Sequence, residues 1–182
     1  MILSGRSFGV LALLALWLSA CRAAPPGPPP ADELRAIEAT IGELYRSFNF
    51  DAGGEADWEL LRSLLIDGAV FVAPVGEDES PRAIGADEFI DGFRAWILTS
   101  PQRESGFHER SVHVRADVFG KVAHAYVVFE GFVPGDGRTK TRGLDSIQLV
   151  LDGERWRVVS FMTQYAGAQS PVPARFEDGR EP

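Results

Sequence analysis

The second half of this 182-residue chain predicts long strands, and this feature limits the possible folds more than any other. Every second residue from Val112 to Val118 is apolar, so these side chains share one face of an extended strand over residues 107–118. Three further strands are predicted at residues 122–133, 144–151 and 156–165. Short turns rich in Gly separate them, because Gly tolerates the left-handed backbone of a tight hairpin. The pattern therefore predicts a meander of four antiparallel strands.

The residues before this meander predict three helices and one short strand. Apolar residues recur at helical spacing from Leu34 to Phe48, which indicates a first helix with one buried face. Asp57 is a good N-cap for a short second helix, and a third helix covers about residues 87–99. Residues 69–73 predict the strand.

Helices that are segregated from an antiparallel sheet are typical of an α+β domain. A long curved sheet with helices on one face leaves a cone, and the open end of the cone is a pocket. Burial preference and spacing assign the large aromatic residues to the core, namely Trp58, Trp96, Phe129 and Trp156.

The only cysteine of the chain, Cys21, ends a short apolar run that is typical of a secretory signal. Residues 18–21 (LSAC) resemble a bacterial lipobox, which implies that residues 1–20 are removed and that Cys21 becomes the acylated first residue. An ordinary signal peptide with a free cysteine is the alternative, although an odd exposed thiol is unusual in a secreted protein. No acidic residue follows Cys21, since Arg22 is next, which favours the outer membrane facing the periplasm of the bacterial cell envelope.

Removal of residues 1–20 would leave 162 residues with 17 basic and 26 acidic side chains, a formal charge of −9. This balance argues against nucleic acid as a partner and against electrostatic attraction to anionic lipids, so the membrane would be reached through the lipid on Cys21. Residues 21–31 are rich in Pro and predict a stiff tether. We expect one domain over residues 32–167 and a polar tail over 168–182, with no disulfide bond.

Several segments of the meander resemble the SnoaL-like branch of the nuclear transport factor 2-like superfamily. The matching positions are residues 119–124, Glu130, 142–149, 152–153, 155–156, Gln164 and 171–173. The resemblance implies a cone-shaped fold, three helices packed on a curved and mostly antiparallel sheet, and often a homodimer through the sheet. The superfamily includes isomerases, dehydratases, polyketide cyclases and binding domains without known activity. This chain departs from the pattern at Asp145, where related chains have Asn, and at Thr163, where an aromatic residue often stands.

The sequence contains no complete motif for a metal site, a phosphate-binding loop or a covalent nucleophile. His108 and His113 are five residues apart in a predicted strand, whereas a zinc-protease signature places two His four apart on a helix. Residues 135–140 imitate a phosphate loop but lie between two strands, which predicts a hairpin turn. With no Gly-x-Ser-x-Gly motif and no other cysteine, we expect neither a metal nor a cofactor.

Acid–base chemistry without a cofactor remains. His124, Asp145 and Glu130 are the catalytic candidates, because His and a carboxyl group in an apolar cavity can exchange protons near neutral pH. We expect the ligand-binding residues to be Tyr126, Arg142, Gln148 and Gln164. In the alternative interpretation, His124, Glu130 and Arg142 satisfy one another in a structural network.

Three functions follow from these predictions. The first is a lipid-anchored domain that binds a small, mostly apolar molecule in its cone and catalyses no established reaction. The second is a cofactor-independent isomerase, dehydratase or hydrolase that uses His124 with Asp145 or Glu130. The third is an envelope interaction protein that uses the exposed sheet. An enzyme requires His124 and a carboxylate facing one open cavity, whereas a cone plugged by Phe and Trp excludes ligand binding.

Overall fold

The computed structural model describes residues 30–72, 80–136 and 138–177. The predicted signal peptide, Cys21 and most of the Pro-rich tether lie outside the described residues. No helix in the described part is both long and apolar enough to cross a membrane.

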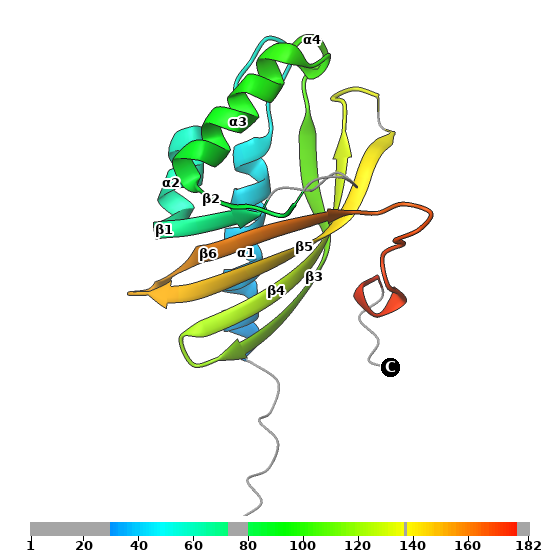
Figure 1. The fold of residues 1–182 in the computed structure, drawn as a ribbon. Helices are drawn as coiled ribbons and strands as arrows, with labels where there is room; N and C mark the ends of the chain where they lie inside the picture. The colour runs from blue at the N-terminus through cyan, green and yellow to red at the C-terminus, as the bar shows by residue number, and fades with distance from the viewer. Residues whose placement is uncertain (1–29, 73–79, 137, 178–182) are drawn as a thin grey trace, which may run out of the picture.

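Helices and one curved sheet form an α+β fold, as the sequence predicts (Figure 1). Helices α1 and α2 come first, then strands β1 and β2, helices α3 and α4, and strands β3 to β6. The bounds are α1 Ala31–Phe48, α2 Trp58–Leu64, β1 Leu65–Val72, β2 Ala83–Gly85, α3 Ala86–Thr99, α4 Gln102–Ser105, β3 His108–Phe119, β4 Val122–Phe132, β5 Thr139–Asp152 and β6 Arg155–Tyr165. A short 3-10 helix, η1, spans Ala174–Phe176.

The sheet has the strand order β2-β1-β6-β5-β4-β3. Strands β3 to β6 form the predicted antiparallel meander. Strand β1 pairs parallel to β6, so the first strand of the chain adds to the sheet beside the last. The sequence did not predict the short β2 or α4, and β5 begins five residues earlier than expected, at Thr139.

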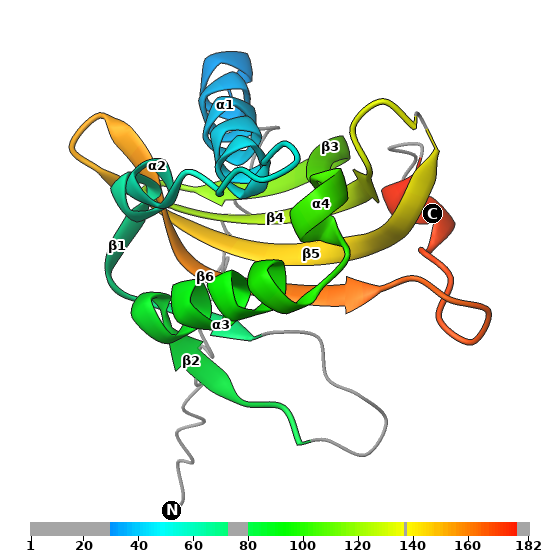
Figure 2. The same ribbon diagram turned by 90° about the horizontal axis from the view of Figure 1, so that it is seen from above.

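The helices lie on the concave face of the sheet, with α1 over β3 and α3 on the side of β1 and β2 (Figure 2). Helix α1 buries the predicted apolar stripe, including Ile37, Ile41 and Leu44. Helix α2 begins where expected, because the Asp57 side chain accepts a hydrogen bond from the Leu60 amide at 2.9 Å. The helices and the sheet enclose the core.

The outer, convex face carries the C-terminal segment. After β6 the chain turns back, and η1 contacts β3 and β4 (Figure 1). The Phe176 ring is 5% exposed and packs on Tyr126, with ring centroids 4.7 Å apart. One edge of the meander's outer face is therefore covered by the chain itself.

Candidate ligand-binding cavity

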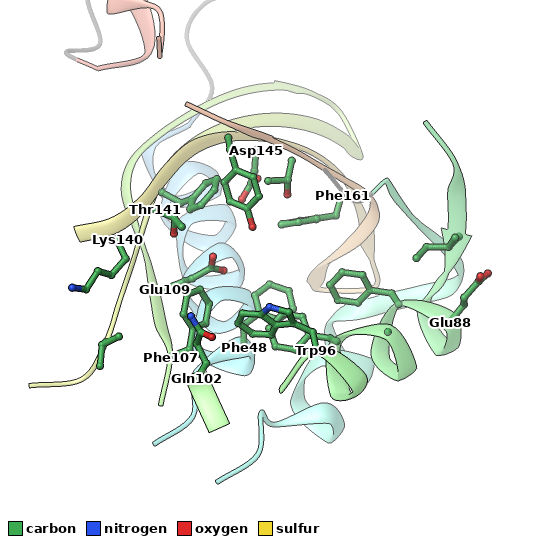
Figure 3. A pocket seen from close by; sticks show the side chains of 18 residues that line it. Phe48, Glu88, Trp96, Gln102, Phe107, Glu109, Lys140, Thr141, Asp145 and Phe161 are labelled. Carbon is green, nitrogen blue, oxygen red and sulfur yellow. The ribbon is translucent and has the colours of Figure 1, made fainter. Parts of the chain in front are cut away.

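A cavity of about 480 Å³ lies between α3, α4 and the concave face of β3 to β6 (Figure 3). This volume is in the range of small-molecule sites. Eight of its 18 lining residues are aromatic, namely Phe48, Phe89, Phe93, Trp96, Phe107, Phe129, Phe161 and Tyr165. Side chains line the cone without plugging it, so the structure meets the condition for ligand binding.

Two glycines on the inner face leave space for aromatic rings of the cavity wall. A Cβ atom at Gly131 would collide with the Thr141 hydroxyl and press on the Phe107 ring. A Cβ atom at Gly143 would collide with the Phe129 ring and with the backbone carbonyl of Gln164. Glycine at these positions lets the rings lie directly against the backbone of β4 and β5.

The polar end of the cavity comes from the pairing of the strands. Asp145 of β5 faces Thr163 of β6, and Glu109 of β3 lies across Gly131 from Thr141. Glu109 and Asp145 reach into the same part of the cavity (Figure 3). Inner-face positions of three strands therefore bring two carboxyl groups and two hydroxyl groups together.

Helix α1 adds a hydroxyl group from behind. The Tyr45 hydroxyl donates a hydrogen bond to Oδ2 of Asp145, which is 2% exposed. The second carboxylate oxygen, Oδ1, is buried and has no hydrogen-bond partner among the described residues. A buried oxygen without a partner is costly, which marks this atom as the place where a bound molecule would be stabilised.

Burial changes the proton affinity of these groups. It raises the pKa of Asp145 to about 7, although the hydroxyls of Tyr45 and Thr163 oppose the increase. Burial, and then the negative charge of Asp145, raise the pKa of Glu109 to about 8. Burial, and then the charge and hydrogen bond of Asp145, also raise the pKa of Tyr45 well above its ordinary value. Near neutral pH this pair of carboxyl groups can therefore both accept and donate protons.

Of the three catalytic candidates, only Asp145 lies in the cavity. Even-numbered residues of β4 point to the outer face, where His124 hydrogen-bonds to the Ser146 hydroxyl at 2.8 Å. Glu130 is on the same outer face and pairs with Arg142 at 2.5 Å and with Arg110 at 2.8 Å. The expected convergence of His124, Glu130 and Asp145 is therefore wrong, because β4 and β5 pair Asp145 with the inward-facing Val127.

The four expected ligand-binding residues also lie outside the cavity lining. Tyr126 stacks between His124 and Phe176. Arg142 pairs with Glu130 and with Glu177, as the alternative interpretation of a structural network anticipated for the first pair. The remaining two make local hydrogen bonds on the outer side: Ser160 donates to Gln148, and the Gln164 amide donates to the Tyr165 carbonyl.

The sequence analysis missed Glu109, and a β-bulge is the reason. The pairing of β3 with β4 shifts between Ser111 and His113, so Val112 is left 47% exposed rather than on the inner face. Extrapolation of the alternation from Val114 towards the start of β3 would place Glu109 outside. The bulge reverses the faces and turns Glu109 inward. Thr163 was noted only as a departure from the family pattern, and Tyr45 only as part of the apolar stripe.

Comparisons with known proteins identify the fold. No family model and no curated protein matches the chain. Solved structures do match. A protein of unknown function with a cystatin-like fold from Nostoc punctiforme has a TM-score of 0.61 at 12% identity, over 78% of this chain and 97% of that one. This chain has the nuclear transport factor 2-like, cystatin-like fold.

Two further structures support this fold. A protein with a cystatin-like fold from Novosphingobium aromaticivorans, described as nuclear transport factor 2-like, has a TM-score of 0.52 at 16% identity, over 76% of this chain and 86% of that one. A protein of unknown function from Mycobacterium tuberculosis has a TM-score of 0.57 at 14% identity, over 79% and 82%. Identities this low show the fold alone, so membership of the SnoaL-like branch stays a prediction.

Proposed function

We propose that this domain binds a small, mostly apolar molecule in the cavity, with a polar group of that molecule placed at Asp145 and Glu109. The observation that carries the proposal is the combination of an open aromatic cavity with a buried, unpartnered oxygen of Asp145. Apolar walls supply affinity, and a few convergent polar groups orient the molecule.

A cavity-filling variant tests the proposal with an uncharged apolar dye, N-phenyl-1-naphthylamine, whose fluorescence increases in an apolar site. Gly92 of α3 lines the cavity, and a Cβ atom there meets nothing within 4 Å. Gly92→Leu should therefore fold normally and narrow the cavity. Dye binding should weaken about tenfold or more, because the dye would lose apolar contact equivalent to roughly one buried side chain.

Gly42→Leu is the matched control, because Gly42 is also helical with open space around its Cβ but lies on the exposed side of α1. It should leave dye binding unchanged. If the dye does not bind to the full chain, or if both variants bind it equally, the cavity is not the binding site.

A second candidate function is cofactor-independent proton transfer, favoured by the raised pKa values of Asp145 and Glu109. In this reaction ionised Asp145 takes a proton from a carbon next to a carbonyl group, and protonated Glu109 donates a hydrogen bond to the carbonyl oxygen. Deuterium exchange at that carbon of an apolar ketone, followed by NMR, tests this function. Exchange that persists in Asp145→Asn would exclude it.

We also propose that a lipid on Cys21 holds the domain at the bacterial cell envelope, in the outer membrane facing the periplasm. The lipobox-like residues 18–21 and the absence of an acidic residue after Cys21 support this. A homodimer through the sheet stays a prediction of the family resemblance.

A further inference from the structure

The polar end of the cavity holds two carboxyl groups without a basic partner among the described residues. Among the described residues, neither Asp145 nor Glu109 forms an ion pair, and the charge that acts on Glu109 is that of Asp145. Two carboxyl groups that share a buried site cannot both ionise at low cost unless a positive charge joins them. The described residues supply none there.

The other titratable groups around the cavity do not fill this need. Tyr45 from α1 and Tyr165 from β6 are neutral, since the pKa of each is raised. The two charged groups in the lining are already paired, Lys140 of β5 with Asp136 at 2.6 Å and Glu88 of α3 with Arg82 at 2.7 Å.

The hydrogen bonds of Asp145 indicate that the group of a ligand beside it is a hydrogen-bond donor. The donors beside Asp145 are neutral hydroxyls: Tyr45 donates to Oδ2, and Thr163 favours the ionised carboxyl group, while Oδ1 has no hydrogen-bond partner of good geometry among the described residues. A donor that also carries positive charge would satisfy Oδ1 and allow Glu109 to ionise beside it. Charge-assisted hydrogen bonds of this kind are roughly twice as strong as neutral ones.

The walls beside the carboxyl groups suit a cation as well. The Phe107 ring lies beside Glu109 (Figure 3). Glu109 and Asp145 act on the Tyr165 hydroxyl, and the Tyr165 ring contacts that of Phe129, so these two rings line the same region. Aromatic faces attract cations, most strongly where water is excluded. An apolar body would fill the remainder of the cavity, along α3.

We propose that the molecule bound in this cavity is an amine, whose protonated nitrogen donates hydrogen bonds to Oδ1 of Asp145 and to the Glu109 carboxylate while its apolar body lies among the aromatic rings. The inference rests on the proposed binding function and names the chemical class of the ligand. A neutral molecule would leave the carboxyl pair without a counter-charge, and an acid would add a third negative group.

Three probes with one skeleton test the amine inference: 1-naphthylmethylamine, 1-naphthalenemethanol and 1-naphthoic acid, titrated calorimetrically into the full chain near pH 7.5. The amine should bind about tenfold or more tightly than the alcohol, because it gains hydrogen bonds to charged groups. The acid should bind most weakly.

The dependence on pH gives a second readout. Binding of the amine favours the ionised carboxyl groups, so protons must leave Asp145 and Glu109, whose pKa values are about 7 and 8 in the free protein. The affinity for the amine should therefore rise from about pH 6 to about pH 8, with proton release in the calorimeter, while the affinity for the alcohol should not rise.

Variants of the two cavity carboxyl groups, with matched controls, test whether these groups cause the preference for the amine. Asp145→Asn and Glu109→Gln should reduce the affinity for the amine to near that for the alcohol and leave the alcohol unaffected. Asp117→Asn and Glu154→Gln, which change exposed carboxylates away from the cavity, should change neither affinity.

Different results would exclude amine recognition and the proposed binding function. An alcohol that binds as tightly as the amine, or an amine affinity that does not change with pH, excludes amine recognition and leaves the cavity a binding site. If the uncharged dye and all three probes fail to bind, both proposals are wrong. The comparison of the three probes in the unmodified chain tests the preference for the amine even if a carboxyl variant does not fold.

Discussion

Asp145 combines a charged side chain with almost complete burial. Its carboxyl group is 2% exposed, accepts one hydrogen bond from Tyr45 and has one oxygen without a partner among the described residues. Such a group favours its protonated form, which is why burial raises the pKa. Glu109 is less completely buried, but burial and then the charge of Asp145 raise its pKa as well.

At the residue scale this predicts how stability depends on pH. The pKa of Asp145 rises from 3.8 to about 7 on folding, so the folded state holds a proton that the unfolded state has lost above about pH 5. The free energy of unfolding should therefore fall as pH increases from about 5.5 to 8, by roughly 2 kcal/mol from Asp145 and about 3 kcal/mol from Glu109, whose pKa rises from 4.5 to about 8.

Urea denaturation of the full chain at the two pH values measures this slope. Asp145→Asn should reduce this change by roughly 2 kcal/mol or more, because an amide does not titrate and carries no charge that raises the pKa of Glu109, while it can still accept the Tyr45 hydrogen bond. Asp117→Asn, at an exposed position, should keep the full slope. An Asp145→Asn protein with the wild-type slope would show that another group titrates.

At the scale of elements, the C-terminal segment closes part of the outer face of the sheet. Phe176 of η1 packs on Tyr126 of β4, and Glu177 pairs with Arg142 of β5 at 2.8 Å. The ion pair is partly exposed and contributes little, so the buried ring provides most of the attachment. The same face is the one through which the family resemblance predicts a homodimer.

Removal of that ring should release the segment. Phe176→Ala is expected to cost about 1–3 kcal/mol of packing, less than a full core substitution because η1 lies at the edge of the fold. Trypsin should then cleave after Arg175 several times faster than in the wild-type protein. Mass spectrometry measures the rate of this cleavage. Phe119→Ala removes an aromatic ring that is 81% exposed and should leave the cleavage rate unchanged. Equal rates in all three proteins would show that Phe176 does not hold the segment.

The elements also show what could be read from the sequence. Helix α1, the Asp57 N-cap and the meander follow from local periodicity and turn residues, so they were predictable. The inner face of β3 was not, because the bulge between Ser111 and His113 reverses the alternation within the strand. The predicted site is wrong for a related reason: the register of β4 and β5, which local pattern does not encode, places His124 and Glu130 on the face of the sheet opposite to Asp145.

At the scale of the whole molecule, the cavity and the N-terminal end of helix α1 lie at opposite ends. Helix α1 begins at the end that holds the β3–β4 hairpin, and α4, which contributes Gln102 to the cavity lining, lies at the other (Figure 1). Eighteen helical residues span about 27 Å. Under the lipid-anchor proposal, the residues that lead from Cys21 would therefore join the domain at the end away from the cavity.

The anchor itself gives a prediction for the full chain produced in bacteria. Metabolic labelling with an alkyne analogue of palmitate should label the wild-type protein, and Cys21→Ser should abolish the label, because the chain contains no other cysteine. Arg22→Ala should keep it. Mass spectrometry of the mature protein should find acylated Cys21 at its N-terminus. An unlabelled wild-type protein that retains residues 1–20 would exclude the lipoprotein proposal.

Local pattern thus determined helices α1 to α3, the order of the meander strands and the α+β class, because side-chain periodicity and turn chemistry act over a few residues. Only the tertiary structure decided the site. Tyr45 and Asp145 are 100 residues apart in the chain, and Glu109 joins them through a bulge. Burial, strand register and the charges of distant segments set the pKa of each carboxyl group, and none of these is a property of the residues near it in the sequence.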